Sequence, residues 1–132
     1  MNALTIRLLA VPKAAPLLRH AVREHIGEAA GCPEAELCVS ELLSNVITHL
    51  GEGTPVTLRV SVHGGGAGNG NGNGRATRTR VELTDPAPHA WPLPRQAGGT
   101  EESGRGLALL DAVTLRWGVT RGSDTKTVWC EL

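Results

Sequence analysis

Residues 40–51, SELLSNVITHLG, combine the pattern of an amphipathic helix with a regular row of polar side chains. The apolar residues recur at steps of three and one, which is the spacing of one face of an α-helix, and Gly51 provides a stop. Glu41, Asn45 and His49 stand four residues apart, so their side chains project from one further face, one above another. A helix does not need such a stripe to fold. The stripe is therefore either an ordinary solvated face or one wall of a binding site.

Another helix is predicted before this one. Residues 14–30 follow helical spacing, and Gly31 is expected to end them. The helix that contains the opening stretch should begin near Cys32, because Pro33 suits a first-turn position and Glu34 suits the positive end of the helix dipole. The apolar side of the earlier helix is expected to carry Leu17, Leu18, Ala21, Val22, His25 and Ile26.

Five segments have the composition or alternation of β-strands: 4–11, 54–62, 77–85, 115–119 and 126–132. Pro12 ends the first, which we expect at a sheet edge. The second and third form an antiparallel hairpin whose Gly/Asn-rich connection, residues 64–74, should be a flexible surface loop. With a third helix over 107–113, this order predicts one α+β domain over residues 1–132, a two-layer sandwich with helices on one face of a mixed sheet.

Composition excludes several classes of protein. The chain has 132 residues, with 13 basic and 13 acidic residues, and it lacks Phe and Tyr. A neutral chain with few aromatic side chains is a poor candidate for direct nucleic-acid binding. Cys32, Cys38 and Cys130 show no CxxC pair, which argues against a disulfide framework or a zinc site and favours buried free thiols in a reducing cytosol. No segment approaches the roughly 20 apolar residues of a membrane span, so we expect a cytoplasmic protein.

Asp85 is the least expected residue of its strand. It alternates in step with Val81 and Leu83, so its carboxylate should point toward the helix-covered face, where an unpaired charge is costly. Either a donor from the protein satisfies it, or it binds a ligand that carries a donor, such as an exocyclic amine.

The segment after Asp85 raises a similar choice. Residues 86–102 are rich in Pro, Gly and polar residues, which predicts a loop long enough to close over a ligand. Gly104-Arg105-Gly106 then leads into a helix, whose N-terminus offers free N–H groups to phosphate. Turn geometry explains a single GxG equally well.

The set of motifs resembles a known family. SELLSNVITH, VELTDPAP, ESGRGLALLDAV, RWGV and KTVWCEL stand in the order and at the spacing of the GHKL (histidine-kinase-like, Bergerat-fold) ATPases. Within that family the chain is most similar to the small anti-sigma-factor serine kinases and related actinobacterial ATP-binding regulators. The resemblance runs from about Ile6 to Leu132, and it implies the Bergerat fold and binding of ATP with Mg²⁺.

The resemblance also implies roles for individual residues. Glu41 resembles the catalytic base, Asn45 the Mg²⁺ ligand and Asp85 the adenine-binding aspartate. The remaining nucleotide-binding positions would be His49 at the helix end, Thr127 near the adenine-contacting strand, and the phosphate-binding end of a short ATP lid of about residues 86–103, made by Gly104, Arg105, Gly106 and Leu107.

By the same resemblance, the protein is expected to be a serine/threonine protein kinase that phosphorylates a STAS-domain anti-anti-sigma protein and sequesters a sigma factor. Relatives pair through their sheets or N-terminal elements, so a homodimer is compatible with this expectation. The chain departs from the family pattern at Asp85-Pro86-Ala87-Pro88, where many relatives have D-x-G-x-G. Because proline fixes φ and lacks an N–H, the alternative is a pseudokinase, a nucleotide-responsive module that binds a regulatory partner without transferring phosphate.

Overall fold

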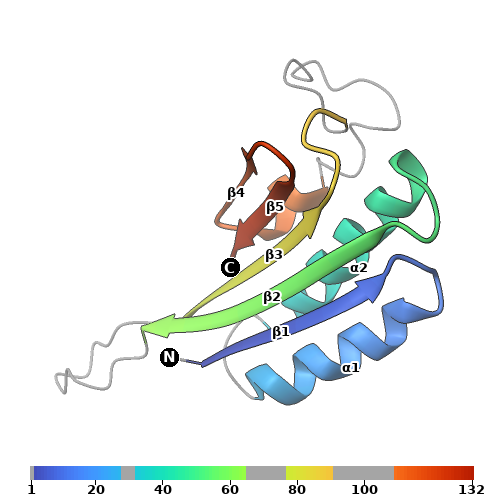
Figure 1. Cartoon of the computed structure of the whole chain (residues 1–132). Helices are drawn as coiled ribbons and strands as arrows, with labels where there is room; N and C mark the ends of the chain where they lie inside the picture. The colour runs from blue at the N-terminus through green and yellow to red at the C-terminus, as the bar shows by residue number, and fades with distance from the viewer. Residues whose placement is uncertain (1, 28–31, 65–76, 91–108) are drawn as a thin grey trace, which may run out of the picture.

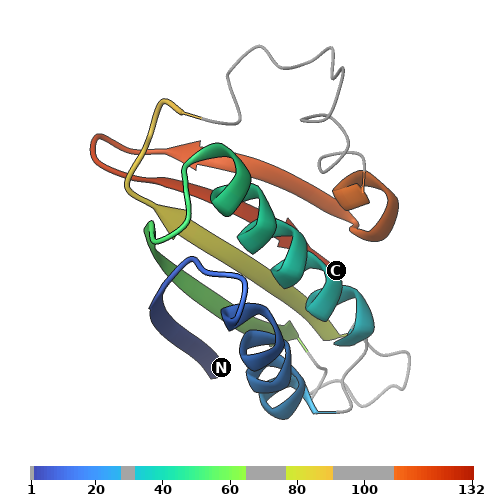
Figure 2. The ribbon, with the colours of Figure 1, turned by 90° about the vertical axis from the view of Figure 1, so that its right-hand side faces the viewer.

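The computed structural model describes residues 2–27, 32–64, 77–90 and 109–132, and it shows two layers (Figure 1). A five-stranded sheet of order β1-β2-β3-β5-β4 forms one layer, and helices cover one of its faces (Figure 2). The elements are β1 (Asn2–Leu9), α1 (Ala14–Ile26), α2 (Cys32–His49), β2 (Pro55–Gly64), β3 (Thr77–Asp85), β4 (Arg116–Arg121) and β5 (Lys126–Glu131). Residues 109–113 are also helical. The predicted α+β sandwich is confirmed.

The four strand pairings are all antiparallel, so the expectation of a mixed sheet was wrong. The reason lies in the connection between β1 and β2. One crossover helix would return the chain to the start of β1 and give a parallel pair. Two successive helices bring it back to the end where β1 finished, so β2 runs in the opposite direction. The predicted position of β1 at the sheet edge is confirmed.

Helix α1 is shorter than its sequence pattern indicated. It ends at Gly27, which has φ +65° and whose N–H donates to the carbonyl oxygen of Arg23 at 2.9 Å. Residues 28–31, which include the expected stop at Gly31, lie outside the described residues. Leu18, Val22 and Ile26 are buried as expected. Leu17, in contrast, is 70% exposed, because it lies one step off the stripe that meets the core.

A bidentate ion pair and a hydrogen bond link the two helices. Arg23 donates from Nε to Glu36 Oε2 at 3.0 Å and from Nη2 to Glu36 Oε1 at 2.8 Å. Arg19 donates to the Ser40 hydroxyl at 3.1 Å. Bidentate geometry fixes direction as well as distance, so these contacts help to set how α1 lies against α2. Neither of these two helices combines the length and the apolar character that crossing a membrane would require.

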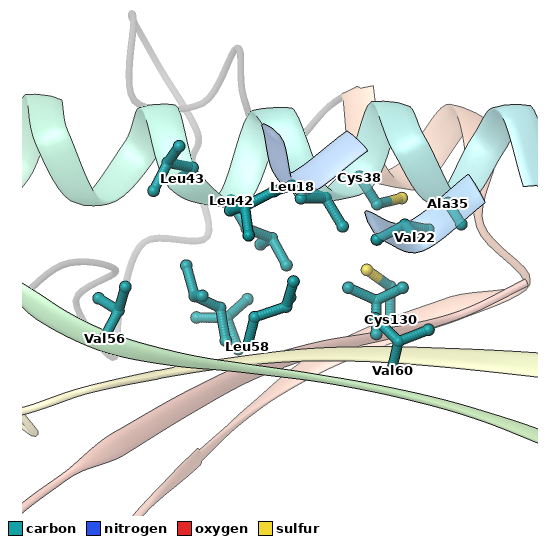
Figure 3. Close-up of a cluster of buried hydrophobic side chains, with 14 of the residues drawn as sticks. Leu18, Val22, Ala35, Cys38, Leu42, Leu43, Val56, Leu58, Val60 and Cys130 are labelled. Carbon is teal, nitrogen blue, oxygen red and sulfur yellow. The ribbon is translucent and has the colours of Figure 1, made fainter. Parts of the chain in front are cut away.

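The core is aliphatic and lies between α2 and the sheet (Figure 3). Leu42 and Leu43 from α2 lie above Leu58 from β2, and all three are almost fully buried. The thiols of Cys38 and Cys130 face each other across the same layer, and both cysteines are free, as the sequence predicted for them. A hydrogen bond with the Cys38 thiol, together with burial, raises the pKa of Cys130.

The opposite face of the sheet carries a polar network around Trp129. The Arg80 guanidinium lies 4.4 Å from the centre of the indole ring, a cation–π distance. Arg80 also donates to Glu82 and Glu131, each at 2.7 Å, and Arg116 donates to Glu131 at 2.7 Å. With these contacts in place, the indole lies against Gly118 of the neighbouring strand β4, its register partner.

Replacing Gly118 by alanine should therefore destabilise the fold. A Cβ at this position would lie 2.6 Å from Trp129 Cζ2 and 2.9 Å from Cε2, and the ring is held by Arg80. We expect Gly118→Ala to lower the free energy of unfolding by about 1–3 kcal/mol, the usual range for overpacking. Gly122→Ala is the matched control, because its nearest contact would be 3.6 Å. Equal urea midpoints for both variants would contradict the packing described here.

The acid stability of the fold should depend in part on Glu131. Hydrogen bonds from Arg116 and then Arg80 lower the pKa of Glu131 below its ordinary value. A depressed carboxyl pKa contributes stability above the ordinary glutamate value, about 4.3, and this contribution is lost as the pH falls through the folded-state value. Glu131→Gln should be less stable than the parent near neutral pH, and the difference should disappear in acid. Urea unfolding over a pH series measures it, and a pH-independent difference would refute the linkage.

Candidate functional site

The polar residues of the candidate site meet where the C-terminal half of α2 passes over the end of β3 and the start of β5. Antiparallel register pairs Asp85 with Lys126 directly, and Asn45 lies on the helix above them. The three surround a small buried cavity of about 10 Å³, room for a single water molecule. Its lining residues are Leu42, Asn45, Val46, Leu50, Leu83, Asp85, Lys126 and Val128.

Both oxygens of the Asp85 carboxylate are engaged. Lys126 Nζ donates to Oδ2 at 2.5 Å, and the N–H of Ala87 donates to Oδ1 at 2.8 Å. Asp85 is 3% exposed and Lys126 is 1% exposed, so this is a fully buried ion pair. The inward orientation predicted for Asp85 is confirmed, and the donors that satisfy it come from the protein. Each carboxylate oxygen keeps a second lone pair, so a further donor can still be accepted.

Lys126 was missed by the sequence reasoning, although a signal for it exists. It alternates in step with Val128 and Cys130, both of which are buried under the helices. The same argument that singled out Asp85 on β3 therefore applies to a lysine on β5. A charged residue on the inward face of one strand requires a partner of opposite charge on the next strand.

Asn45 is the one residue of the opening stripe that lines the cavity. It is 9% exposed, and its amide nitrogen has no hydrogen-bond partner among the residues that the structure describes. A half-turn of the terminal amide exchanges its nitrogen and oxygen, so the side chain can present either a donor or an acceptor at this position. A buried polar group without a partner is costly, and binding sites are where such groups are retained.

The other residues of the predicted site are placed around this cavity. Glu41 lies one turn before Asn45 on α2 and is half-buried, outside the cavity lining. His49 lies in the last turn of α2, also half-buried. Thr127 points to the opposite face of the sheet, where its hydroxyl and that of Thr84 are 2.7 Å apart. The sheet position that faces the cavity is its neighbour, Lys126.

The glycine-led phosphate segment falls outside the described residues. Gly104, Arg105, Gly106 and Leu107 belong to residues 91–108, as does most of the predicted lid. The first part of that lid is described, and it is held at two points. Ala87 donates to Asp85, and Arg121 of β4 donates from Nη1 to the carbonyl oxygen of Pro88 at 2.9 Å. The turn after Asp85 thus takes its donor from Ala87, where Pro86 has none.

A wider hollow of about 470 Å³ lies beside the buried cavity, at the ends of β1, β2 and β3. It also reaches Asp85, together with Arg7, Thr84 and Thr125. Asn45 and the other α2 residues do not line it, so it lacks the amide that the cavity under the helix provides. We therefore take the smaller cavity, where residues of α2, β3 and β5 converge, as the candidate site.

Disrupting the buried pair from one side should be costly. Asp85→Ala leaves the Lys126 ammonium buried without its counterion, and we expect a loss of about 3–5 kcal/mol in the free energy of unfolding. The double variant Asp85→Leu/Lys126→Met removes both charges with similar volumes and should recover most of that loss. Urea denaturation of the parent and the two variants measures this. A double variant no more stable than the single one would show that the cost does not come from the isolated charge.

Comparison with known sequences identifies the family of this chain. Residues 8–131 match the histidine kinase-like ATPase domain. An uncharacterized protein of Streptomyces coelicolor is 48% identical to this chain over 94 residues, which is 70% of this chain and 79% of that protein. The family match spans α2, β3 and β5, the three elements that build the cavity. The chain belongs to the histidine kinase-like ATPase domain family, the GHKL type, whose name implies ATP as the ligand.

Proposed function

We propose that this protein is a cytoplasmic, ATP- and Mg²⁺-binding regulator that acts as a serine/threonine protein kinase. The observation that carries the proposal is the shared cavity of Asp85 and Asn45, a buried carboxylate and a buried amide with an unused atom, in a histidine kinase-like ATPase domain. A carboxylate accepts a hydrogen bond from the exocyclic amine of adenine, and an amide oxygen is a hard ligand suited to Mg²⁺.

Each residue then has a role in binding or transfer. Asp85 would hold the adenine amine, and Asn45 would offer an amide oxygen to Mg²⁺, which would supply charge neutralisation at the phosphates. Glu41, one turn away on the same helix, orients the incoming serine hydroxyl and accepts its proton. By the family resemblance, Gly104, Arg105, Gly106 and Leu107 would bind the phosphates, as backbone N–H groups and a guanidinium can. His49 would flank the nucleotide, as the family resemblance implies. Thr127, which points to the opposite face of the sheet, would support the adenine-contacting strand through its contact with Thr84.

The partners belong to the same proposal and rest on resemblance. The substrate would be a serine of a STAS-domain anti-anti-sigma protein, and the sequestered partner would be a sigma factor. The neutral overall charge favours protein partners over direct nucleic-acid contacts.

A second candidate function is favoured by one specific observation. Both oxygens of Asp85 already accept hydrogen bonds from the protein, and Pro86 and Pro88 occupy the segment where many relatives have glycines. A nucleotide-responsive module that sequesters its partner without phosphate transfer fits this altered segment. Binding of ATP and transfer of phosphate therefore need separate tests.

Binding is tested by calorimetry with ATP and Mg²⁺. Asp85→Asn keeps the size of the side chain and exchanges a charged acceptor for an amide. It should weaken ATP binding about 10- to 150-fold, which corresponds to the loss of about 1.5–3 kcal/mol for a hydrogen bond to a charged group. Asp111→Asn is the control, because Asp111 is exposed and bonds to Trp117. No heat of binding from the parent protein at millimolar ATP would exclude both candidate functions.

Transfer is tested with γ-labelled ATP and a STAS-domain protein as acceptor. Glu41→Gln should reduce the rate of phosphate transfer by about 10²- to 10⁴-fold, because the proton acceptor is lost, while ATP affinity stays within about twofold. Glu52→Gln, an exposed change just after α2, is the matched control. Normal binding with no labelled acceptor from the parent protein would favour the sequestering module over the kinase.

A further inference from the structure

The cavity that Asp85 shares with Asn45 beneath α2 is far smaller than a purine. Binding sites for small molecules usually occupy on the order of 300 Å³ or more, whereas the cavity between α2, β3 and β5 holds about 10 Å³. Most of its walls are aliphatic side chains that also belong to the close-packed core, such as Leu42, Val46 and Leu83. Enlarging the cavity by moving those residues would open the core itself.

Lys126 is the wall residue best able to move. It is the first residue of β5 and follows the exposed residues Asp124 and Thr125 of the β4–β5 turn, so solvent lies close to its backbone. Its side chain is long and unbranched, and an ammonium regains strong hydration when it reaches water. Swinging this side chain outward would empty the space next to Asp85 and leave the aliphatic walls in place.

The Lys126 ammonium also makes the contact with Asp85 that is expected of the ligand. Lys126 Nζ donates to Asp85 Oδ2, the kind of contact that the exocyclic amine of adenine would make with the same carboxylate. Ala87 holds the other oxygen, so the carboxylate stays oriented when its partner is exchanged. One nitrogen donor can thus replace another as the hydrogen-bond partner of the carboxylate. The amine of adenine is neutral, so the exchange keeps the hydrogen bond and gives up the ion pair.

We propose that the Lys126 side chain occupies the space that adenine would take in the cavity between α2, β3 and β5. Adenine must displace Lys126 from Asp85 in order to bind, and this residue therefore sets the affinity of the site for 6-aminopurine nucleotides. The inference rests on the proposed function, because it assumes that ATP enters this cavity. Binding then requires a state in which Lys126 has swung out. The measured affinity is the intrinsic affinity multiplied by the population of that state.

The main test compares Lys126→Thr with the parent by calorimetry with ATP and Mg²⁺. Threonine suits a strand, removes the ammonium and most of the bulk, and keeps a hydroxyl that can donate to Asp85. If the swung-out state is populated at roughly 0.1–10%, the variant should bind ATP about 10- to 1,000-fold more tightly. Lys126→Gln, which keeps most of the length and an amide donor for Asp85, should gain less, and it provides a second folded variant should threonine destabilise the core.

Inosine triphosphate tests whether Asp85 recognises the 6-amino group, since inosine has a 6-oxo group in its place. The gain in Lys126→Thr should be largest for ATP and should require Asp85, so Asp85→Asn/Lys126→Thr should lose it. Weaker ATP binding by both Lys126 variants would overturn the proposal, because it would make the lysine a contact for the nucleotide. Tighter binding of inosine triphosphate than of ATP by the parent would overturn it for the same reason. If no protein binds ATP, the proposed function fails together with the inference.

The parent protein offers an independent measurement, because the chain contains two lysines, Lys13 and Lys126. Lys13 is exposed and serves as an internal control for an amine-acetylating reagent followed by mass spectrometry. Lys126 should be protected without nucleotide and should become more reactive as ATP and Mg²⁺ are added, while Lys13 stays constant. Saturation with ATP that leaves the acetylation of Lys126 unchanged would show that base binding and the ion pair coexist, and would overturn the displacement.

Discussion

The antiparallel register between β3 and β5 fixes both the packing of the core and the position of the buried ion pair. Because side chains alternate between the two faces, this register places every second residue of both strands beneath α2. Val81 and Leu83 on one strand and Val128 and Cys130 on the other then build the core. The same alternation forces the last inward residue of β3 and the first of β5 to face each other, and both are charged. A shift by one residue would expose the core and separate the two charges.

Local patterns predicted the elements well, and the arrangement of the strands less well. The limits of β3 and the start of α1 follow from alternation and helical spacing, signals that lie within a few residues of each other. The antiparallel pairing of β1 with β2 depends instead on two helices acting together, which no short window contains. Leu17 shows the same limit within one helix, since its spacing fits a stripe of helical apolar residues and only the path of the sheet decides that Leu18 is the one covered.

The site was predictable where a residue violated its own local pattern. A carboxylate among valine and leucine identified Asp85, and the four-residue spacing identified Asn45. That Asn45 faces the cavity while Glu41 lies outside its lining depends on how α2 is rotated against the sheet, which the stripe does not encode. Thr127 and Lys126 differ by one residue and face opposite ways, so identifying the one that faces the cavity required the parity of β5. The pairing itself is a tertiary contact across 41 positions of sequence.

The facing thiols of Cys38 and Cys130 make the separation of α2 from the sheet measurable. Both are fully enclosed, one on the helix and one on the strand below it, so an alkylating reagent reaches them only after α2 lifts away from β5. Their modification rate therefore measures how often α2 and β5 separate by local opening, and the same two elements enclose the candidate site. A ligand that holds the helix against the sheet would lower the rate of alkylation, even without contacting either sulfur.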